Sequence, residues 1–308
     1  MRRRSTRARP ALAVGALCAA ALLSGVAPAS AAPFWDHWSD GKAELNGYDL
    51  VQPRYGELRR GRAVLVYVTE PWSRSRRVKV DRFDPKDADQ FTALKLNVVR
   101  KFQTGLYDYS VMTSVFVDPG ADFAPVQVTF SGQEWCGHVF ETLSYEKGGA
   151  TLRTLSYFEG ETTQVTLPDP APLTEDALFV RARGLAADTL AREGGAVTLV
   201  GSALDRRLHH RPAEPFTTTL RWSDAPTSRA VPAGTFETHT LTYDRQGGGA
   251  CRLHVEVPYP HRLIGWDCDD GEKAALRGTA RLPYWQLHGE GQEKLLEQLG
   301  LTPPGYAP

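Results

Sequence analysis

Short apolar runs, several of them alternating with polar residues, recur along most of this sequence, and they constrain the fold more than any other feature. Residues 63–68 form a β-branched apolar run, and in 94–98 leucine and valine alternate with polar residues. A period of two places successive side chains on opposite faces of a strand, so both segments are predicted to be strands. Further strand candidates are 109–117, 142–145, 154–157, 196–204, 216–222, 235–243, 251–257 and 262–266.

Turn residues separate these runs, and helical patterns are scarce. Gly148 and Gly149 supply the turn of one hairpin. Only two short helices are expected, over 174–184 and 292–299. Because strands follow one another without regular helical crossovers, we predict an all-β fold with two short helices. Its expected architecture is a large curved antiparallel sheet, open or half-closed like a barrel.

The first 31 residues have the pattern of an export signal. Five arginines precede an apolar stretch over 11–26, which ends at the small residues Ala29-Ser30-Ala31. We therefore predict a signal peptide over 1–31, cleaved near Ala31, and a protein located in the periplasm or outside the cell. An uncleaved anchor is the alternative. Residues 32–308 are expected to form a single β-rich domain, and two lobes divided near 168–172 are the alternative.

Charge excludes some partners of the mature chain. Removing the five signal arginines from 36 basic residues leaves 31, against 36 acidic residues. A mildly acidic protein without a large basic patch is a poor match for nucleic acid. No apolar stretch after residue 31 is long enough to span a membrane. No cofactor and no metal site are predicted.

Three cysteines follow the signal, and one pair is predicted to form a disulfide. Cys251 and Cys268 flank a hairpin pattern whose turn is expected at Tyr259 and Pro260. That register places the two cysteines opposite each other, at a distance that a disulfide can bridge. Cys136 is then a free thiol, which is unusual in an oxidising compartment.

The segment around this thiol is the densest group of reactive residue types. If 133–138 is a strand, Glu134, Cys136 and His138 share one face, as a nucleophile, its base and an orienting carboxylate would. However, neighbours on one strand face lie about 7 Å apart, which is long for a catalytic pair. A buried structural cysteine is the alternative and is favoured. Familiar hydrolase, metalloprotease and nucleotide-binding motifs are missing from the sequence.

Aromatic and basic residues suggest where a ligand could bind. The candidates are Trp35 and Trp38 near the mature N-terminus, Trp135, and Tyr259, His261 and Arg262 in the proposed turn. Each group has a structural alternative, since the N-terminal rings could dock on the body and the turn could simply be rigid. In contrast, His209 and His210, with the arginines beside them, are predicted to form a solvated loop.

Four motifs together resemble a family of largely uncharacterised exported bacterial proteins, whose members sometimes carry a septum-formation-inhibitor label. They are Trp38 to Glu44, Arg54 to Glu57, Gln133 to His138, and Tyr259 to Arg262. The resemblance covers most of the mature chain and implies no established activity. The label itself suggests a cytoplasmic α/β nucleotide pyrophosphatase, which conflicts with the export signal and the strand pattern.

The sequence thus favours a non-catalytic exported β-protein that binds an apolar or amphipathic ligand, or a component of the cell envelope, inside a curved sheet. One alternative is a hydrolase or transferase centred on Cys136, with His138 or His261 as its base. The other is a structural protein that makes interactions in the envelope.

Overall fold

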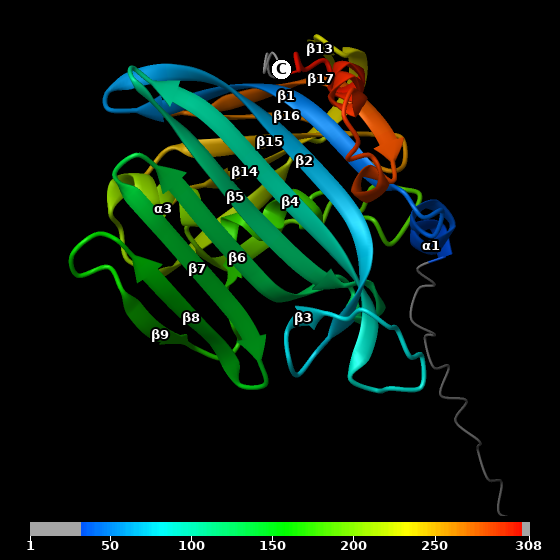
Figure 1. The fold of residues 1–308 in the computed structure, drawn as a ribbon, viewed down its shortest axis with the longest axis horizontal. Helices are drawn as coiled ribbons and strands as arrows, with labels where there is room; N and C mark the ends of the chain where they lie inside the picture. Colours follow the sequence, from blue (N-terminus) through cyan, green and yellow to red (C-terminus); the bar gives the residue numbers. More distant parts are fainter. Residues whose placement is uncertain (1–31, 304–308) are drawn as a thin grey trace, which may run out of the picture. The chain divides into compact units, whose positions relative to one another are not determined.

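The computed structural model describes residues 32–303, so the predicted signal peptide lies outside the described residues. Seventeen strands make up most of this part of the chain (Figure 1). In chain order they are β1 (Ala43–Arg54), β2 (Glu57–Ser73), β3 (Val78–Lys79), β4 (Gln90–Thr104), β5 (Tyr107–Asp118), β6 (Ala124–Glu134), β7 (Gly137–Glu146), β8 (Gly149–Ser156), β9 (Thr163–Leu167), β10 (Leu173–Thr174), β11 (Gly195–Val200), β12 (Pro215–Trp222), β13 (Thr227–Val231), β14 (Gly234–Asp244), β15 (Ala250–Glu256), β16 (Leu263–Cys268) and β17 (Lys273–Leu282).

The strands pair into one strongly curved sheet. Neighbouring strands run in the order β9-β8-β7-β6-β5-β4-β2-β1-β17-β16-β15-β14, all antiparallel. At the far edge of β14, its first half pairs with β13 and its second half with β12. Strand β11 pairs with β12, and β10 runs parallel to β11. Within the described residues β9 does not pair with β10, so the sheet is not closed into a barrel. This confirms the predicted fold class.

Helical segments are short. They are α1 (Ala32–Trp38), η1 (Pro119–Ala121), η2 (Glu175–Ala177), α2 (Leu178–Arg181), α3 (Ala203–His209), η3 (Tyr284–Gln286) and η4 (Gln292–Leu299). The helix predicted over 174–184 is replaced by η2 and α2, and the one predicted over 292–299 is a 3-10 helix. The strand predicted over 196–204 ends at Val200, because Ser202 caps α3 and begins a helix there.

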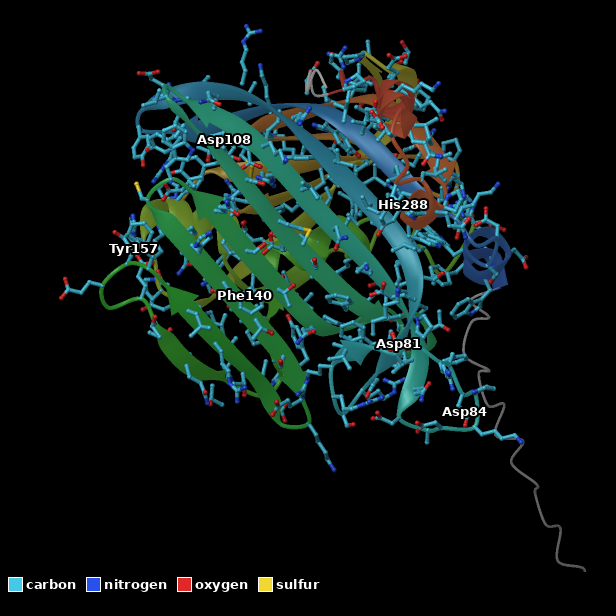
Figure 2. All side chains as sticks on the ribbon, viewed as in Figure 1. Asp81, Asp84, Asp108, Phe140, Tyr157 and His288 are labelled. Carbon is cyan, nitrogen blue, oxygen red and sulfur yellow. A yellow bond between two sulfur atoms is a disulfide. The ribbon has the colours of Figure 1, made fainter. Side chains whose placement is uncertain are left out.

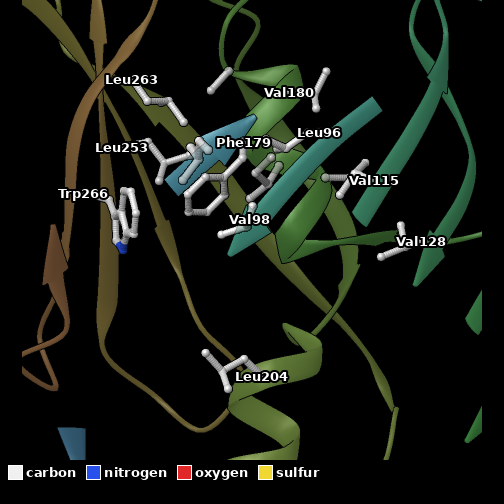
Figure 3. Close-up of a cluster of buried hydrophobic side chains, with 14 of the residues drawn as sticks. Leu96, Val98, Val115, Val128, Phe179, Val180, Leu204, Leu253, Leu263 and Trp266 are labelled. Atoms are coloured by element: carbon white, nitrogen blue, oxygen red, sulfur yellow. The ribbon is translucent and has the colours of Figure 1, made fainter. Parts of the chain in front are cut away.

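The α2 segment fills the middle of the concave face. Phe179 lies 5.1 Å from the ring of Trp266, and Tyr67 of β2 donates a hydrogen bond to the Phe179 carbonyl at 2.9 Å. Figure 3 shows Phe179 surrounded by side chains from strands on both sides of the curve, among them Leu96 and Leu253. The concave face is therefore a packed core over its middle rather than the open interior that we expected.

A second apolar cluster lies on the other face, where η4 covers β1 and β17. Gly47 and Gly278 are partners in these strands, and the chain near Leu299 packs directly over them. A Cβ built on Gly47 would lie 2.3 Å from the Leu299 carbonyl oxygen, so only glycine allows this approach.

Candidate functional site

A cavity of about 440 Å³ lies between the concave face of β6 to β9 and the helix α3. Its size falls within the range of small-molecule pockets, which is roughly 300–1,000 Å³. The strand wall is apolar and the helix wall is charged. The apolar lining is Phe130, Val139, Leu152 and Val165, and the charged lining is Glu141, Glu161, Arg206, Arg207, His210, Arg211 and Glu214.

Helix α3 positions the charged wall. Ser202 caps its start by accepting a hydrogen bond from the Asp205 backbone N–H, and His210 ends it in the left-handed region with φ 53°. Arg206 and Arg207 are both buried, so the predicted solvated loop is wrong at these positions. The stretch Ser202-Ala-Leu-Asp205 was the available signal, because a serine followed three residues later by an acid is a helix-start pattern.

Arg206 forms the inner end of the charged wall. Its guanidinium pairs through both terminal nitrogens with the Glu141 carboxylate, and its Nε donates to the Gly201 carbonyl at 3.0 Å. Both side chains are buried. Removing one partner of such a pair leaves an uncompensated charge and costs about 3–5 kcal/mol. We therefore assign this pair to holding α3 against β7.

Arg207 differs from Arg206, because not every nitrogen of its guanidinium makes a hydrogen bond within the described residues. Its Nη2 lies 3.3 Å from Glu134 Oε1, and its guanidinium stacks over the Phe158 ring at 4.0 Å from the ring centroid. The side chain is only 7% exposed. Its Nη1 has no hydrogen-bond partner in residues 32–303. A buried, unpartnered donor on a cationic group is energetically costly unless an acceptor reaches it.

The exposed side of the cavity is formed by His210 and Glu161, whose side chains are in contact. Burial would raise the pKa of Glu161, but hydrogen bonds with His210 and Ser156, together with the positive charge of Arg207, outweigh it and hold that pKa below its usual value. The carboxylate therefore stays ionised, and the entrance carries one fixed negative charge beside an imidazole.

The predicted catalytic residues lie just outside this cavity but do not converge. The expected strand ends at Glu134, and Trp135 and Cys136 form the two-residue turn between β6 and β7. Cys136 and His138 are exposed, whereas Glu134 is buried and contacts Arg207. The favoured alternative of a buried structural cysteine is therefore wrong.

Glu134 acts on Cys136 as well. Its Oε2 accepts a hydrogen bond from the Cys136 backbone N–H at 2.7 Å. A hydrogen bond from the thiol to this carboxylate, together with its negative charge, raises the pKa of Cys136. An activated thiol needs the opposite environment, one that stabilises the thiolate.

The predicted turn and N-terminal residues gather around a buried arginine at another part of the sheet. Arg183 pairs with Glu44 at 2.8 and 2.9 Å and donates to the Pro260 carbonyl at 2.8 Å. Trp38 is buried nearby, with the Arg183 guanidinium 5.7 Å from its ring. His261 is fully buried there, with both ring nitrogens 3.3 Å from backbone carbonyl oxygens.

Tyr259 adjoins that cluster. The ring of Tyr259 packs against His261, and Arg262 pairs with Glu256 at 2.7 and 2.8 Å. Trp35 is partly exposed on α1, and Trp135 is exposed on the turn beside the cavity. Of the binding residues that the sequence singled out, only Trp135 lies near the cavity.

A hydrogen-bonded group of Thr240, His254 and Asp267, which the sequence did not predict, lies on the sheet face opposite the core. His254 Nε2 contacts Asp267 at 2.6 Å, and its Nδ1 lies 3.1 Å from the Thr240 hydroxyl. Burial lowers the pKa of His254 despite the carboxylate. This is the connectivity of a nucleophile, base and orienter, but none of the three residues lines any of the three cavities of about 340–440 Å³ in the described part of the chain. The second of these cavities, about 370 Å³, is walled mainly by apolar side chains such as Val180, Leu185 and Trp222.

Comparison with known proteins adds one structural likeness. No family model matches the sequence, and no curated protein matches it. Among solved structures, the chain is similar to a β-barrel-like protein of the domain of unknown function DUF1849 from Brucella abortus. The TM-score is 0.47 at 11% identity, over 78% of this chain and 98% of that one. No helix among residues 32–303 is both long and apolar enough to cross a membrane.

Proposed function

We propose that this protein is an exported binding protein that holds an amphipathic ligand in the cavity between β6 to β9 and α3. The observation that carries the proposal is that Arg207, which lines the cavity together with apolar and charged residues, is a buried cation whose Nη1 has no hydrogen-bond partner among the described residues. Because this nitrogen is itself buried, the side chain must rotate slightly to meet a bound acceptor. A ligand with a carboxylate or similar acceptor would satisfy that donor while its apolar part covers Phe130, Val139 and Leu152.

Binding rather than catalysis follows from the state of the nearby groups. Arg206 and Glu141 neutralise each other, and the raised pKa of Cys136 disfavours its thiolate. The cavity therefore offers a hydrogen-bond donor and an apolar wall, and none of the described residues that line it is an activated nucleophile.

The test uses dodecanoate and its uncharged analogue dodecanol as probes in titration calorimetry. We expect saturable binding of dodecanoate, with dodecanol weaker by roughly tenfold or more, the value of a charge-assisted hydrogen bond. The Arg207→Gln variant should lose this preference. Arg153→Gln is the matched control, since Arg153 is exposed on β8 next to cavity-lining Leu152. Equal affinity of wild type and Arg207→Gln for dodecanoate would refute the site.

Export is part of the same proposal and rests on the signal pattern and on a disulfide between Cys251 and Cys268. Protein isolated from its native host should begin near Ala32. N-terminal sequencing that finds the first 20 residues retained would contradict cleavage.

A further inference from the structure

Four connections between strands lie at the same end of the sheet as the cavity entrance. They join β1 to β2, β4 to β5, β6 to β7 and β8 to β9, and the antiparallel register brings all four to the same end of the strands. Each carries a large exposed side chain. These are Tyr55, Leu106, Trp135 and Tyr157, with exposed fractions of 57%, 80%, 68% and 67%. Figure 2 labels Tyr157 at this end, and Asp81 and Asp84 toward the opposite end.

These side chains are held together as one surface, which we call the aromatic rim: Tyr55, Leu106, Tyr107, Trp135 and Tyr157. The Tyr107 hydroxyl lies 3.1 Å from that of Tyr55, and the rings of Tyr107 and Trp135 are 6.4 Å apart. Tyr157 packs against the β6–β7 turn, where a Cβ on Gly137 would meet its ring at 2.5 Å. The rim is thus prearranged although it is exposed.

Connections at the other end of the same strands are mainly polar, although Phe83 after β2 is 45% exposed. The β7–β8 turn consists of Glu146, Lys147, Gly148 and Gly149, and the segment after β2 begins with Arg74, Ser75, Arg76 and Arg77. The two ends therefore differ in chemistry, and only one presents large rings at successive tips. Exposing so many apolar and aromatic groups together marks an interaction surface.

We propose that the aromatic rim docks on the interface of a lipid bilayer. Tyrosine and tryptophan combine an apolar ring with a polar tip, and this suits the boundary between headgroups and acyl chains. Each hairpin tip can insert its own side chain into the soft boundary of a bilayer. A flat protein partner would contact only the outermost atoms of the tips, so a bilayer buries more of these side chains. Arg59 pairs with Glu57 beside the rim, whereas Arg54 contacts the Tyr55 hydroxyl and the Leu208 carbonyl and has no carboxylate partner among the described residues. Exposed Asp108 and Glu159 lie at the same end of the strands, so charges of both signs surround the rim and no basic cluster forms among the described residues there. A basic cluster is what selects anionic lipid, so the matching bilayer is zwitterionic.

This inference rests on the proposed function, because the rim is continuous with the cavity. Tyr157 contacts Phe158, whose ring lies under the Arg207 guanidinium and beside His210 at the entrance. A docked rim holds the entrance at the depth where amphipathic molecules lie in a bilayer. It thereby specifies the ligand class as a lipid-derived amphiphile with one anionic end.

The experiment measures co-sedimentation of the protein with phosphatidylcholine vesicles. We expect the wild type to bind, with little change between low and high salt, because the contact is not ionic. Leu106→Ser combined with Trp135→Ser should weaken binding about tenfold or more, from lost apolar contact. Phe83→Ser combined with Trp285→Ser, which removes two similarly large exposed side chains elsewhere, should leave binding unchanged.

Three results would overturn the proposal. In the first, the wild type does not bind phosphatidylcholine vesicles. In the second, the rim variant and the control variant lose vesicle binding to the same extent. In the third, binding requires phosphatidylglycerol and disappears in high salt. The single Leu106→Ser variant guards against misfolding, since that side chain is 80% exposed. The ligand-binding proposal and the membrane-docking proposal can each be refuted without refuting the other. The rim variant should keep its dodecanoate affinity in solution, and Arg207→Gln should keep its vesicle binding.

Discussion

At the scale of single residues, Glu134 contacts two groups at once: the guanidinium of Arg207, which is a cation, and the backbone of Cys136, which carries a thiol. One oxygen contacts the Arg207 guanidinium that lines the cavity, and the other accepts from the backbone of the exposed Cys136. The same carboxylate therefore orients the proposed ligand-binding cation and suppresses ionisation of the thiol.

Alkylation of Cys136 with iodoacetamide near neutral pH should therefore be slow although the thiol is exposed, because the reagent needs the thiolate. Glu134→Gln should accelerate it severalfold, since removing the carboxylate's negative charge lowers the pKa of the thiol and raises the thiolate fraction. Mass spectrometry of quenched samples measures the rate.

Glu159→Gln, which changes an exposed acid on the β8–β9 connection, is the control and should leave the rate unchanged. Rapid labelling of the wild type that depends on His138 would instead favour the cysteine enzyme. An unchanged rate in Glu134→Gln would show that this carboxylate does not control the thiol.

A second residue-scale prediction concerns pH. Burial raises the pKa of Glu175 to about 7 although Arg245 opposes the shift. Between pH 4.5 and 7 the unfolded chain ionises this group while the folded chain keeps it protonated, so its contribution to stability falls as pH rises. Buried Glu272 behaves oppositely. Arg100 and Arg245 overcome its burial and hold its pKa at about 2, so its contribution is lost only as pH falls below 4.5.

The free energy of unfolding of the wild type should therefore fall by up to about 1.4 kcal/mol per pH unit between about pH 5 and 7 because of this group. Glu175→Gln cannot ionise at this position, so the variant should lack this part of the fall. Urea denaturation at several pH values measures this slope. Glu290→Gln, at an exposed position, is the control. A variant with the wild-type slope would mean that Glu175 is ionised throughout this range.

At the scale of elements, the hairpin of β15 and β16 shows how a register can be derived from sequence. Cys251 and Cys268 are opposite each other and form the predicted disulfide. Replacing both with serine should lower the free energy of unfolding by roughly 2–4 kcal/mol, mainly because the unfolded chain gains entropy. Chemical denaturation checks this, with reduced wild type as the matched comparison. A loss below about 0.5 kcal/mol would contradict it.

Alternation and turn residues predicted most strands of the sheet, because these signals are local. The β7–β8 hairpin, for instance, follows from Gly148 and Gly149. Helix α3 was missed because its apolar residues follow β11 with only a two-residue break at Gly201 and Ser202. That error hid the site, since Arg206 and Arg207 resemble surface residues until a helix directs them toward Glu141 and Glu134. Partners 65 and 73 residues apart leave no local pattern.

At the scale of the whole described fold, the curved sheet encloses part of its own chain rather than a large empty space. Phe179 and its neighbours occupy the middle of the concave face, so cavities remain only beside this filling. Sequence patterns indicate which residues are apolar, but not whether a segment or a ligand covers them. The predicted open interior therefore becomes a smaller site with one charged wall.

The first long strand of the described fold pairs with its last strand. Ala43 of β1 is opposite Leu282 of β17, and this seam lies inside the sheet between β2 and β16. All the other strands lie between these two in the sequence, so β1 keeps one unpaired edge until β17 joins the sheet. Such distant pairing slows folding and leaves an edge open to other chains. A truncated or stalled product that ends before β17 would therefore be a natural target for chaperones and proteases.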